Sequence, residues 1–507
     1  MLKKCQVFSH SMIENVRVRF APSPTGGLHI GGVRTALFAY LFAKQNEGTF
    51  ILRVEDTDQT RFVEGAEEYI VDTLEWCGII PDESPQKGGE YGPYRQSERK
   101  ADYRKYAEQL VESGHAYYAF DTPQELTTMR EEFKTKENPS PQYDKNTRGE
   151  MKNSLTLSTN EVAEFLEKNT PHVIRIKVPA DEKIQFRDII RGEIENDSNL
   201  LDDKVLLKAD GMPTYHLAVV VDDYLMKVSH VFRGEEWLSS APIHVLLWRY
   251  LGWSSDSPDW AHLPLILKPD GNGKLSKRDG DRLGFPVFPL QWNDNKGYRE
   301  KGFLPAAFIN MLSVLGWNDG TDEEMFSMND LLQKFDVTRI NKAGAKFNFD
   351  KAIWYNAEWI KRMSLEELLP LVKNELSRVG LEPTDDKIKV VLALVQERIS
   401  LLPDAVKEMD YFFRKPSAVD METIQKKWSE QHTAFYTELK TIWTDTEWTK
   451  ENLETTFKEL IAKHEMKMGA VMLPFRIMLV GGKFGPGVFD IAHFLGREEV
   501  LTRIITE

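Results

Sequence analysis

The chain has 507 residues, of which 41% are hydrophobic and 28% charged, and its formal net charge is −14. This length exceeds what one hydrophobic core supports, so it predicts a globular protein of several domains. No apolar run reaches the ~18–20 residues of a membrane-spanning helix, which argues against a membrane protein. With only Cys5 and Cys77, the chain has no disulfide framework and no cysteine cluster for structural zinc, and it fits a reducing compartment.

The negative net charge argues against a general nucleic-acid binder, because such proteins are usually basic. It leaves room for an enzyme that acts on RNA, since phosphates need only a local basic track. Pairs of basic residues are candidates for that track, although each pair alone is typical of a solvated surface: Lys342 and Lys346, Arg414 and Lys415, Lys426 and Lys427.

Residues 1–12 form an N-terminal extension with Lys3 and Lys4 and no acid. The extension is too short and polar for a secretory signal, and it lacks the arginine of a mitochondrial presequence. Met12 is a candidate alternative start, because the fold is expected to begin just after it. The function of the extension stays open, and we expect a cytoplasmic protein.

The stretch 16–32, VRVRFAPSPTGGLHIGG, predicts a strand, a turn and the start of a helix. Its first five residues alternate between apolar residues and arginine, as in a pleated strand. Two prolines then hold the chain extended, and Gly26 and Gly27 allow a tight turn. After His29 the apolar residues recur at helical spacing, which predicts a helix over 33–46. The free N–H groups expected at this helix start suit a phosphate; the alternative is an ordinary turn with a surface histidine.

The chain after this helix continues the pattern of an open α/β sheet. The predicted elements are a strand over 49–54, a helix over 61–77, a glycine-rich loop over 86–97 and a helix over 98–114. Glu55 and Asp56 stand at the end of the predicted strand. Ligands bind at the carboxyl ends of strands in such sheets, which favours a function for at least one of these two acids.

From about residue 117 the rhythm changes, and the next ninety residues mix charged helices with strands. This indicates an insertion between the two halves of a nucleotide-binding sheet. The elements predicted inside it are helices over 123–135 and 159–168 and strands over 172–178 and 184–190.

The main sheet is predicted to resume at Val205 and to continue from Tyr215 to Val221. The second segment is almost wholly apolar, as a strand buried on both faces would be, and Asp222 and Asp223 end it. The next predicted elements are a helix over 240–252 and a short strand over 263–267. A loop rich in glycine and aspartate follows, and it contains KLSKR at 274–278.

From Phe303 onward helical periodicity dominates, and beyond about residue 350 it is almost continuous. Helices are predicted over 352–362, 364–379, 385–401, 403–413, 419–439 and 448–464, with a turn over 481–487 before the last helices.

Two separated elements resemble the signature motifs of class I aminoacyl-tRNA synthetases. His29-Ile30-Gly31-Gly32 resembles the HIGH element, with glycine in place of its last histidine, and KLSKR resembles KMSKS. PSPTG at 22–26, RVEDTD at 53–58, GPYRQSER at 92–99, DGMPTYHLAVVVDD at 210–223 and FRGEEWLSSAPIH at 232–244 are similar to one family, the bacterial-type glutamyl-tRNA synthetases. Several motifs in the right order are specific where one alone is weak. The resemblance is strong over 16–350 and fainter beyond.

The resemblance implies an α/β fold: a Rossmann-like nucleotide-binding parallel sheet, split by an α+β insertion and followed by an all-α C-terminal anticodon-binding region. The implied domains are 13–116 and 205–255 (the two halves of the catalytic domain), 117–204 (the acceptor-stem-binding insertion), 256–349 (the KLSKR loop and stem contacts) and 350–507 (the anticodon-binding region). The segment LGFPVFPLQWNDNKGYRE, 283–300, is longer than the family's usual connection. It should be an ordered loop, and its role is open.

The resemblance also implies the activity of a glutamate–tRNA ligase. ATP and L-glutamate would form glutamyl-adenylate, and the glutamyl group would pass to the terminal adenosine of tRNA(Glu). His29, Lys274 and Lys277 would stabilise the phosphate charge, and Mg²⁺ bound by ATP would share it. The implied glutamate contacts are Arg19, Ala21, Ser23, Glu55, Tyr215 and Arg233, with both arginines on the side-chain carboxylate and Glu55 on the ammonium. The implied ATP contacts are Pro22, Thr25, Gly26, His29, Gly31, Trp237, Leu267 and Lys277.

Two departures from the family qualify this interpretation. Val219 stands where some relatives place an asparagine that contacts the substrate. Tyr118 and Phe120 stand where some relatives place zinc-binding cysteines, so we expect no zinc and no protein-only metal site. We expect a monomer with no membrane partner.

Three alternative functions can be compared with the residues present. A glutaminyl enzyme would usually carry PEPNG rather than PSPTG, a short tRNA-modifying paralogue would lack the C-terminal helices, and a catalytically dead RNA-binding paralogue should have lost His29 or the lysines. Whether tRNA(Gln) is also charged stays open, with Arg398 a candidate discriminator by position. Whether glutamate activation needs bound tRNA stays open as well.

Overall fold

The computed structural model describes residues 15–426 and 428–506. The N-terminal extension, Cys5 and Lys427 of the expected basic track therefore lie outside the described residues. The chain forms two compact units. The first holds the described residues up to Gly297 together with Ile309–Asn348, and the second holds Tyr298–Phe308 and the described residues from Phe349 on.

The first unit is organised around a six-stranded sheet with the order β2-β1-β8-β9-β5-β6. Its strands are β1 (Arg17–Phe20), β2 (Thr49–Leu52), β5 (Lys183–Asp188), β6 (Gly192–Asp197), β8 (His230–Gly234) and β9 (Asp259–Leu263). All neighbours pair in parallel except β5 and β6, which form an antiparallel hairpin. Val18 of β1 is opposite Phe50 on one side and His230 on the other. The predicted parallel sheet is confirmed.

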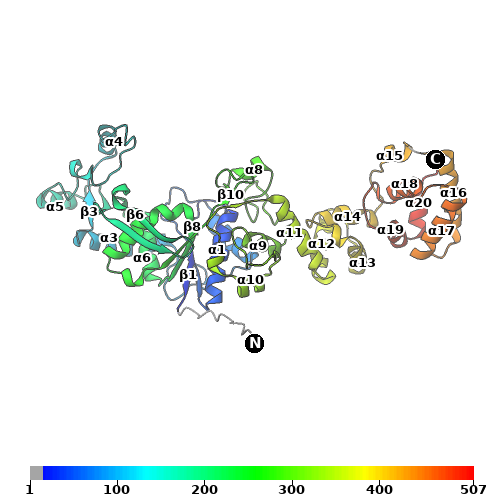
Figure 1. Cartoon of the computed structure of the whole chain (residues 1–507), viewed down its shortest axis with the longest axis horizontal. Helices are drawn as coiled ribbons and strands as arrows, with labels where there is room; N and C mark the ends of the chain where they lie inside the picture. Colours follow the sequence, from blue (N-terminus) through cyan, green and yellow to red (C-terminus); the bar gives the residue numbers. More distant parts are fainter. Residues whose placement is uncertain (1–14, 427, 507) are drawn as a thin grey trace, which may run out of the picture. The chain divides into compact units, whose positions relative to one another are not determined.

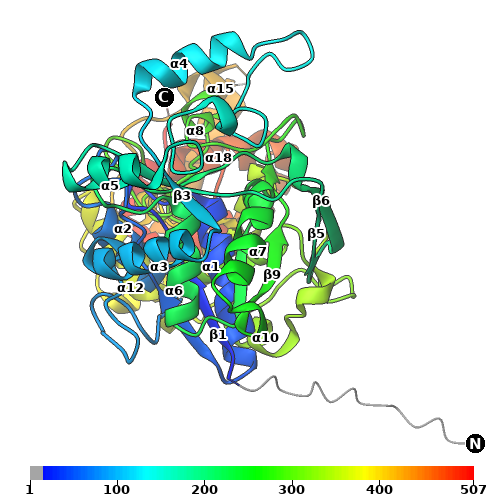
Figure 2. The same ribbon diagram turned by 90° about the vertical axis from the view of Figure 1, so that its left-hand side faces the viewer.

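The two faces of this sheet carry different side chains because successive strand residues point to opposite faces. Helix α1 (Ile30–Gln45) packs on one face, where the ring of Phe42 lies 5.2 Å from that of Phe232. On the other face Arg19 of β1 contacts Asp223 of helix α6 (Tyr215–Leu225), and Arg233 of β8 contacts α6 and helix α7 (Ala241–Tyr250). Figure 2 shows α6 and α7 beside β1 and β9. The arginines thus lie between the sheet and these two helices.

The predicted buried strand over 215–221 is wrong, because these residues form the first two turns of α6. The helix begins after Thr214 and buries Leu217 to Asp223 without a break. A continuous apolar run does not distinguish a buried strand from a buried helix, and three consecutive valines favoured the strand. The helix matters for function because it brings Asp222 and Asp223 against the arginines of the sheet.

The insertion has a three-stranded antiparallel sheet of its own, made of β3 (Ala116–Ala119), β4 (Val173–Ile176) and β7 (Val205–Leu207) in the order β3-β4-β7. It also holds helices α4 (Pro123–Glu132) and α5 (Thr159–Glu167), seen at the front of Figure 2.

Two assignments of strands to sheets are corrected. The main sheet does not resume at Val205, since β7 pairs with β4. The strand predicted over 184–190 inside the insertion is β5, which joins the main sheet through Asp188 and Trp260. The alternation of buried residues shows that β5 is half-buried. The hydrophobic pattern of a strand does not show which other strand it pairs with.

The remaining α-helices and strands of the first unit are α2 (Ala66–Trp76), α3 (Lys100–Glu112), β10 (Ile266–Leu267), α8 (Asp279–Leu283), α10 (Met328–Lys334) and β11 (Ala345–Lys346). The strand predicted over 263–267 is divided at Pro264: Leu263 ends β9, and β10 pairs in parallel with β11. Helix α9 (Pro305–Ser313) contains the boundary at Phe308 between the two units.

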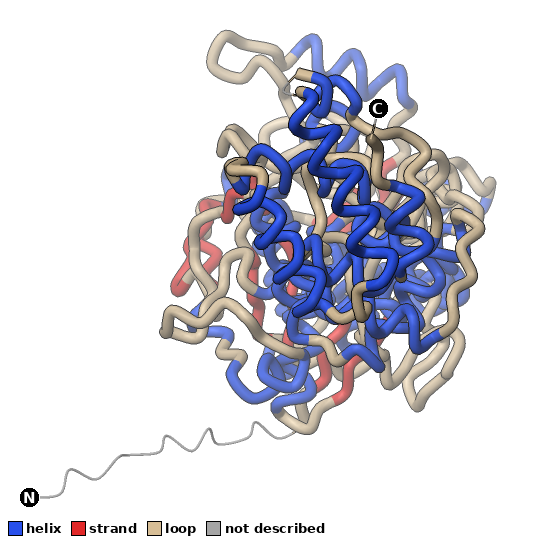
Figure 3. Tube along the Cα trace, turned by 90° about the vertical axis from the view of Figure 1, so that its right-hand side faces the viewer, coloured by secondary structure: helices blue, strands red, loops and turns tan. Residues whose placement is uncertain are grey.

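The second unit is helical; Figure 3 draws helices in blue. Its helices are α11 (Phe349–Arg362), α12 (Leu365–Arg378), α13 (Asp385–Val395), α14 (Asp404–Phe413), α15 (Met421–Gln425), α16 (Glu430–Asp445), α17 (Lys450–Lys463), α18 (Met468–Val480), α19 (Val488–Leu495) and α20 (Arg497–Arg503). The all-α C-terminal region is confirmed (Figure 1).

One predicted helix of this unit is divided. The helix over 419–439 is in fact α15 and α16, because α16 starts afresh after Ser429, whose backbone N–H donates to Nδ1 of His432 at 3.2 Å. Between residues 15 and 506, apart from 427, no helix is long and apolar enough to span a bilayer.

Candidate active site

The turn between β1 and α1 opens into a cavity of about 630 Å³ in the first unit. Gly26 has a φ of +126°, a conformation that a side chain would strain. The cavity is lined by residues from this turn, from β8, from α6 and from the KLSKR loop. Segments that are far apart in the sequence therefore meet at the carboxyl ends of β1 and β8, where ligands bind in such sheets.

His29 caps helix α1 and presents one free donor to the cavity. Its Nδ1 accepts the Gly31 N–H at 3.1 Å, so the neutral ring carries its proton on Nε2. Nε2 is buried and has no protein partner. Burial, and then the charges of Lys274 and Lys277, lower the pKa of His29 to about 4. At neutral pH the ring is therefore an uncharged Nε2–H donor.

The first backbone N–H groups of α1 are not free, contrary to the expectation for the helix start. The Ile30 N–H donates to the Val287 carbonyl at 3.0 Å, the Gly31 N–H to His29, and the Gly32 N–H to the His29 carbonyl at 2.8 Å. The acceptor on Val287 comes from a segment far along the chain, so no local pattern announces it. The groups here that could hold a phosphate are His29 Nε2, the N-terminal end of the helix dipole and the lysines of the loop.

The two lysines of KLSKR have different partners. Lys277 lines the cavity, and its Nζ lies 3.7 Å from the position that a Cβ on Gly26 would take. It forms no ion pair with any described carboxylate, and burial lowers its pKa. Lys274 is ion-paired with Glu236, which also lines the cavity. A phosphate that draws Lys274 to itself must compete with this carboxylate.

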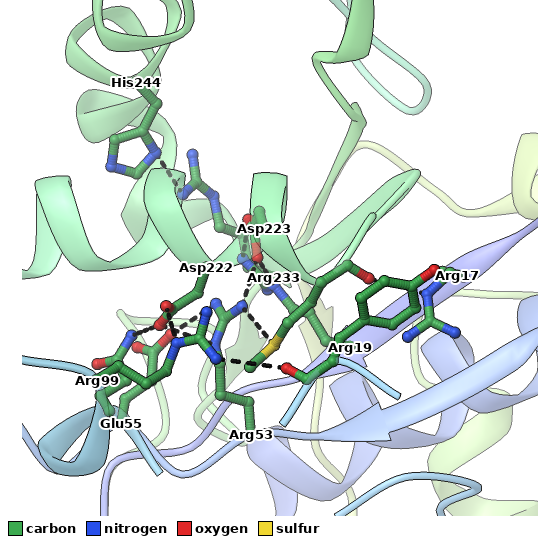
Figure 4. Close-up of polar contacts among 12 residues, drawn as sticks. Arg17, Arg19, Arg53, Glu55, Arg99, Asp222, Asp223, Arg233 and His244 are labelled. Atoms are coloured by element: carbon green, nitrogen blue, oxygen red, sulfur yellow. Dashed lines mark hydrogen bonds and ion pairs between the residues drawn. The ribbon is translucent and has the colours of Figure 1, made fainter. Parts of the chain in front are cut away.

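A buried ionic network occupies the opposite end of the cavity, under α6 (Figure 4). Asp223 accepts from Arg19 Nε at 3.1 Å and Arg19 Nη2 at 3.2 Å, and from Arg53 Nη1 at 2.7 Å. Arg53 Nη2 also donates to Glu55 Oε1 at 3.1 Å. Burial alone would raise the pKa of Asp223, but Arg19 and Arg53 hold it below its usual value. Burial raises the pKa of Glu55 despite the same arginines.

Asp222 closes this network on its far side. It accepts from Arg99 Nε at 2.7 Å, Gln96 Nε2 at 2.8 Å and the Tyr103 hydroxyl at 2.9 Å. These bonds hold α6 against the segment before α3, so Asp223 and its arginines have fixed positions. Arg53 Nε also lies 3.9 Å from Asp222 Oδ2, so Arg53 forms ion pairs with both adjacent acids of α6.

Arg233 has neutral partners only. Its Nε donates to His262 Nε2 at 2.9 Å, and its Nη1 contacts the Tyr215 hydroxyl at 3.0 Å and His244 Nδ1 at 3.1 Å. It is 5% exposed, no described carboxylate lies within ion-pair distance, and its Nη2 has no protein partner. A buried guanidinium without a counter-ion calls for an anionic ligand.

Two histidines position Arg233 by accepting its hydrogen bonds. His262 Nδ1 contacts Asp188 Oδ2 at 2.6 Å, so its Nε2 is left as the acceptor for Arg233. Burial, and then the charge of Arg233, lower the pKa of His244 well below 6.5, which keeps the ring neutral. Asp188 comes from β5, so the hairpin of the main sheet helps to place the arginine.

The cavity brings together nearly all the expected site residues. Of the predicted catalytic, glutamate and ATP contacts, only Leu267 is not part of its lining; it lies in β10. Trp237 is 41% exposed, and its ring lies 4.4 Å from that of Tyr215. Val219 is buried in α6 away from the lining. Asp56 binds Ser97 through both carboxylate oxygens and is structural.

Sequence reasoning missed the residues that hold Arg19 and Arg233 or lie behind their partners: Arg53, Asp188, Asp222, Asp223, His244 and His262. Asp222 and Asp223 were interpreted as the end of a strand. The sequence offers a signal for the two acids: Asp222 and Asp223 directly follow an apolar run, in a chain that carries arginines on two predicted strands. Among the described residues, no group of three or more histidine, cysteine, aspartate or glutamate side chains could hold a metal.

Comparison with known proteins agrees with this geometry. Residues 15–354 match the family of tRNA synthetases class I (E and Q), catalytic domain, and residues 361–506 match the anticodon binding domain family. The glutamate–tRNA ligases of Flavobacterium johnsoniae and Phocaeicola vulgatus are each 51% identical to this chain, over 97% and 96% of it and 99% and 97% of their own lengths.

A solved structure extends the similarity to three dimensions. The crystal structure of a glutamate tRNA ligase from Elizabethkingia meningosepticum, in complex with its amino acid, superposes with a TM-score of 0.92 at 47% identity and covers 97% of this chain and 98% of its own. The chain therefore belongs to the class I tRNA synthetases of the E and Q group.

Proposed function

We propose that this protein is a glutamate–tRNA ligase, which joins L-glutamate to the terminal adenosine of tRNA(Glu) with ATP. The observation that carries the proposal is Arg233, a buried guanidinium with an unpartnered Nη2 in the same cavity as His29 and Lys277. The side-chain carboxylate of glutamate supplies the missing negative charge. The neutral amide of glutamine does not, which favours glutamate over the glutaminyl alternative.

The amino-acid end of the cavity, formed by Arg19, Glu55, Tyr215 and Arg233, would hold glutamate. Arg233 and the Tyr215 hydroxyl would bind the side-chain carboxylate. Arg19 is already held by Asp223 through Nε and Nη2, so only its Nη1 would join them. Glu55 would face the ammonium group, with Ala21 and Ser23 beside it, and the raised pKa of Glu55 supports a site that awaits a cation.

The phosphate end, formed by Gly26, His29, Lys274 and Lys277, would hold the triphosphate of ATP. Pro22, Thr25 and Gly31 line the same turn, and Trp237 would pack against the adenine. Leu267 would contribute from just beyond the lining. The acids near the cavity are engaged by arginines and by Lys274, and Mg²⁺ would arrive on the ATP phosphates and neutralise part of their charge.

The reaction would proceed in two steps. A glutamate α-carboxylate oxygen forms a bond to the α-phosphorus, and the bond to pyrophosphate breaks. His29 Nε2–H and the two lysines stabilise the charge that shifts to the departing phosphates. A hydroxyl of the tRNA's terminal adenosine then attacks the acyl carbon, loses its proton, and AMP leaves with the electron pair of the broken bond.

The rest of the chain would hold the tRNA. The insertion over 117–204 would contact the acceptor stem, and the helical region over 350–507 would contact the anticodon. The protein would act as a monomer in the cytoplasm, where tRNA is charged. Arg398 lies at the end of a short 3₁₀ turn, Gln396–Arg398, between α13 and α14. It remains our candidate for discrimination between tRNA(Glu) and tRNA(Gln).

The test is charging of purified tRNA(Glu) and tRNA(Gln) with labelled glutamate, by the wild type and by Lys277→Ala. The matched control is Lys105→Ala, on the exposed side of α3. We expect charging of tRNA(Glu) that falls about 10²–10³-fold in Lys277→Ala and stays unchanged in the control. Charging of both tRNAs would identify a non-discriminating enzyme. No charging of either tRNA with glutamate would overturn the proposal.

A further inference from the structure

The segment Gly284–Gly297, which follows the KLSKR loop and α8, lies against the turn between β1 and α1. The ring of Trp292 is so close to Gly27 that a Cβ there would lie 2.6 Å from Cγ and 2.9 Å from Cδ2 of the indole. Trp292 Nε1 and Lys277 Nζ lie 4.0 and 3.7 Å from the Cβ position of Gly26. The indole and the lysine therefore flank the same glycine.

Two further attachments hold the segment in place. The Tyr69 hydroxyl of α2 donates to the Leu290 carbonyl at 2.7 Å and accepts the Leu290 N–H at 3.2 Å. The ring of Tyr69 also meets that of Trp292 edge-on, with centroids 5.0 Å apart. The Val287 carbonyl accepts the first N–H of α1. The segment is thus fixed to α1 and to α2, on either side of the glycine turn.

The glycine turn needs such support because glycine restricts its backbone least of all residues. His29 and Lys277 act on phosphates only if they are placed within about 0.5 Å of the productive geometry. Trp292 packs on the turn that leads to His29, and its own segment continues directly from the loop that carries Lys277. One side chain therefore links the positions of both groups.

We propose that Trp292 is a positioning residue for ATP: its indole holds the Gly26–Gly27 turn in register with Lys277. The inference rests on the proposed ligase function. It assigns a role in the nucleotide half of the reaction to a segment that the catalytic groups leave unexplained. The amino-acid end lies under α6 and has no contact with Trp292, so glutamate binding should not depend on the indole.

The test measures the KM for ATP and the KM for glutamate separately, in tRNA charging by the full chain. Trp292→Ala should raise the KM for ATP about tenfold, with the KM for glutamate within about twofold, because displacement of a catalytic group by ~1 Å is worth up to ~10²-fold. In Trp292→Phe the KM for ATP should lie between that of the wild type and that of Trp292→Ala. Tyr69→Phe keeps the ring, loses the bonds to Leu290, and should show a smaller rise. Gln291→Ala, exposed in the same segment, is the matched control.

A rescue experiment separates positioning from a general loss of stability. In Gly27→Ala the new methyl group collides with the indole and with nothing else within 3 Å, so the KM for ATP should rise. In Gly27→Ala/Trp292→Ala the methyl group has room, so the double variant should have the KM for ATP of Trp292→Ala alone. Losses that add would mean that the methyl group disturbs the turn by a route other than the indole.

The outcomes distinguish this inference from the proposed function. An inactive wild type would refute the ligase. An active wild type whose Trp292→Ala and Trp292→Phe variants keep the normal KM for ATP would refute the positioning role, as would a double variant in which the two losses add. If the variants that contain Trp292→Ala fail to fold, Trp292→Phe and Tyr69→Phe decide the question.

Discussion

The two ends of the cavity are built on different principles. At the amino-acid end the charged groups are buried and come from strands and helices: Asp223 binds Arg19 and Arg53, and two histidines accept hydrogen bonds from Arg233. At the phosphate end they come from a glycine turn and a loop, and Lys274 is half-exposed and paired with Glu236. The charges at the first end are thus fixed by buried protein partners, whereas Lys274 at the second end is held by a half-exposed ion pair.

This difference teaches where selectivity resides. A preorganised buried site distinguishes two amino acids of nearly equal size by charge, because rearrangement to suit the wrong one is costly. The groups proposed to bind the phosphates lie on a turn and a loop instead, and contacts between segments, such as Trp292 against Gly27, place them. The predictions below test each end, from the largest expected effect to the smallest.

The largest effect is expected from Arg233→Gln. The variant removes a buried charge that has only neutral partners among the described residues, so kcat/KM for glutamate should fall about 10³-fold or more, as for a lost buried charge contact of about 4 kcal/mol. Charging kinetics with glutamate and glutamine measure it. Arg249→Gln, on the surface of α7, is the control. An Arg233→Gln enzyme with normal selectivity for glutamate over glutamine would show that glutamate binds elsewhere.

At the phosphate end, His29→Asn should reduce kcat about 10²–10³-fold. Asparagine is a good N-cap, so its side chain keeps the bond to the Gly31 N–H while the Nε2 donor is lost. Thermal melting should therefore change little. A variant that keeps full kcat would remove His29 from the mechanism.

His29 also makes the free energy of unfolding depend on pH. The unfolded chain binds a proton at His29 near pH 6.5, whereas burial lowers the pKa in the folded protein to about 4. The stability from the neutral ring is complete above pH 6.5 and is lost as the pH falls towards 4. Denaturant unfolding at several pH values should show a shallower acid loss in His29→Asn than in the wild type; equal curves would contradict the assignment.

A smaller loss of activity, with a larger loss of stability, is expected from Asp223→Asn. Arg19 and Arg53 would keep their charges and lose their shared carboxylate, which destabilises the fold by about 3–5 kcal/mol as for other broken buried pairs. The KM for glutamate should rise about tenfold because Arg19 is no longer fixed. Glu164→Gln, which breaks an exposed pair with Lys168, should leave both quantities unchanged. A rise in the KM for ATP alone would contradict the division of the cavity into two ends.

The smallest effect should come from Glu236→Gln. The half-exposed pair with Lys274 is worth at most about 1 kcal/mol, so its loss should lower the KM for ATP by about fivefold or less as Lys274 becomes free for phosphate. ATP titrations of the charging reaction measure this change. A raised KM would mean that Glu236 itself supports the nucleotide.

The parts of the site that could be predicted are those formed by residues that are contiguous in the sequence. The strand, glycine turn and histidine of 16–32 specify their own local structure, and KLSKR is recognisable in its loop. Neither the bond from Val287 to the first N–H of α1 nor the pairing of Arg19 with Asp223 is local, since more than 200 residues separate each pair. The helix α6 was mistaken for a strand because burial on all sides erases the periodicity that distinguishes the two.

The placement of β5 has a consequence for anyone who divides this enzyme into parts. Asp188 fixes His262, which in turn fixes Arg233, yet it lies inside the stretch 117–204 that the sequence pattern predicts to be a separate insertion. A chimera made by exchanging that whole stretch would remove a support of Arg233 along with the rest of the insertion. Grafts that leave Lys183–Asp197 in place would keep that support with its host.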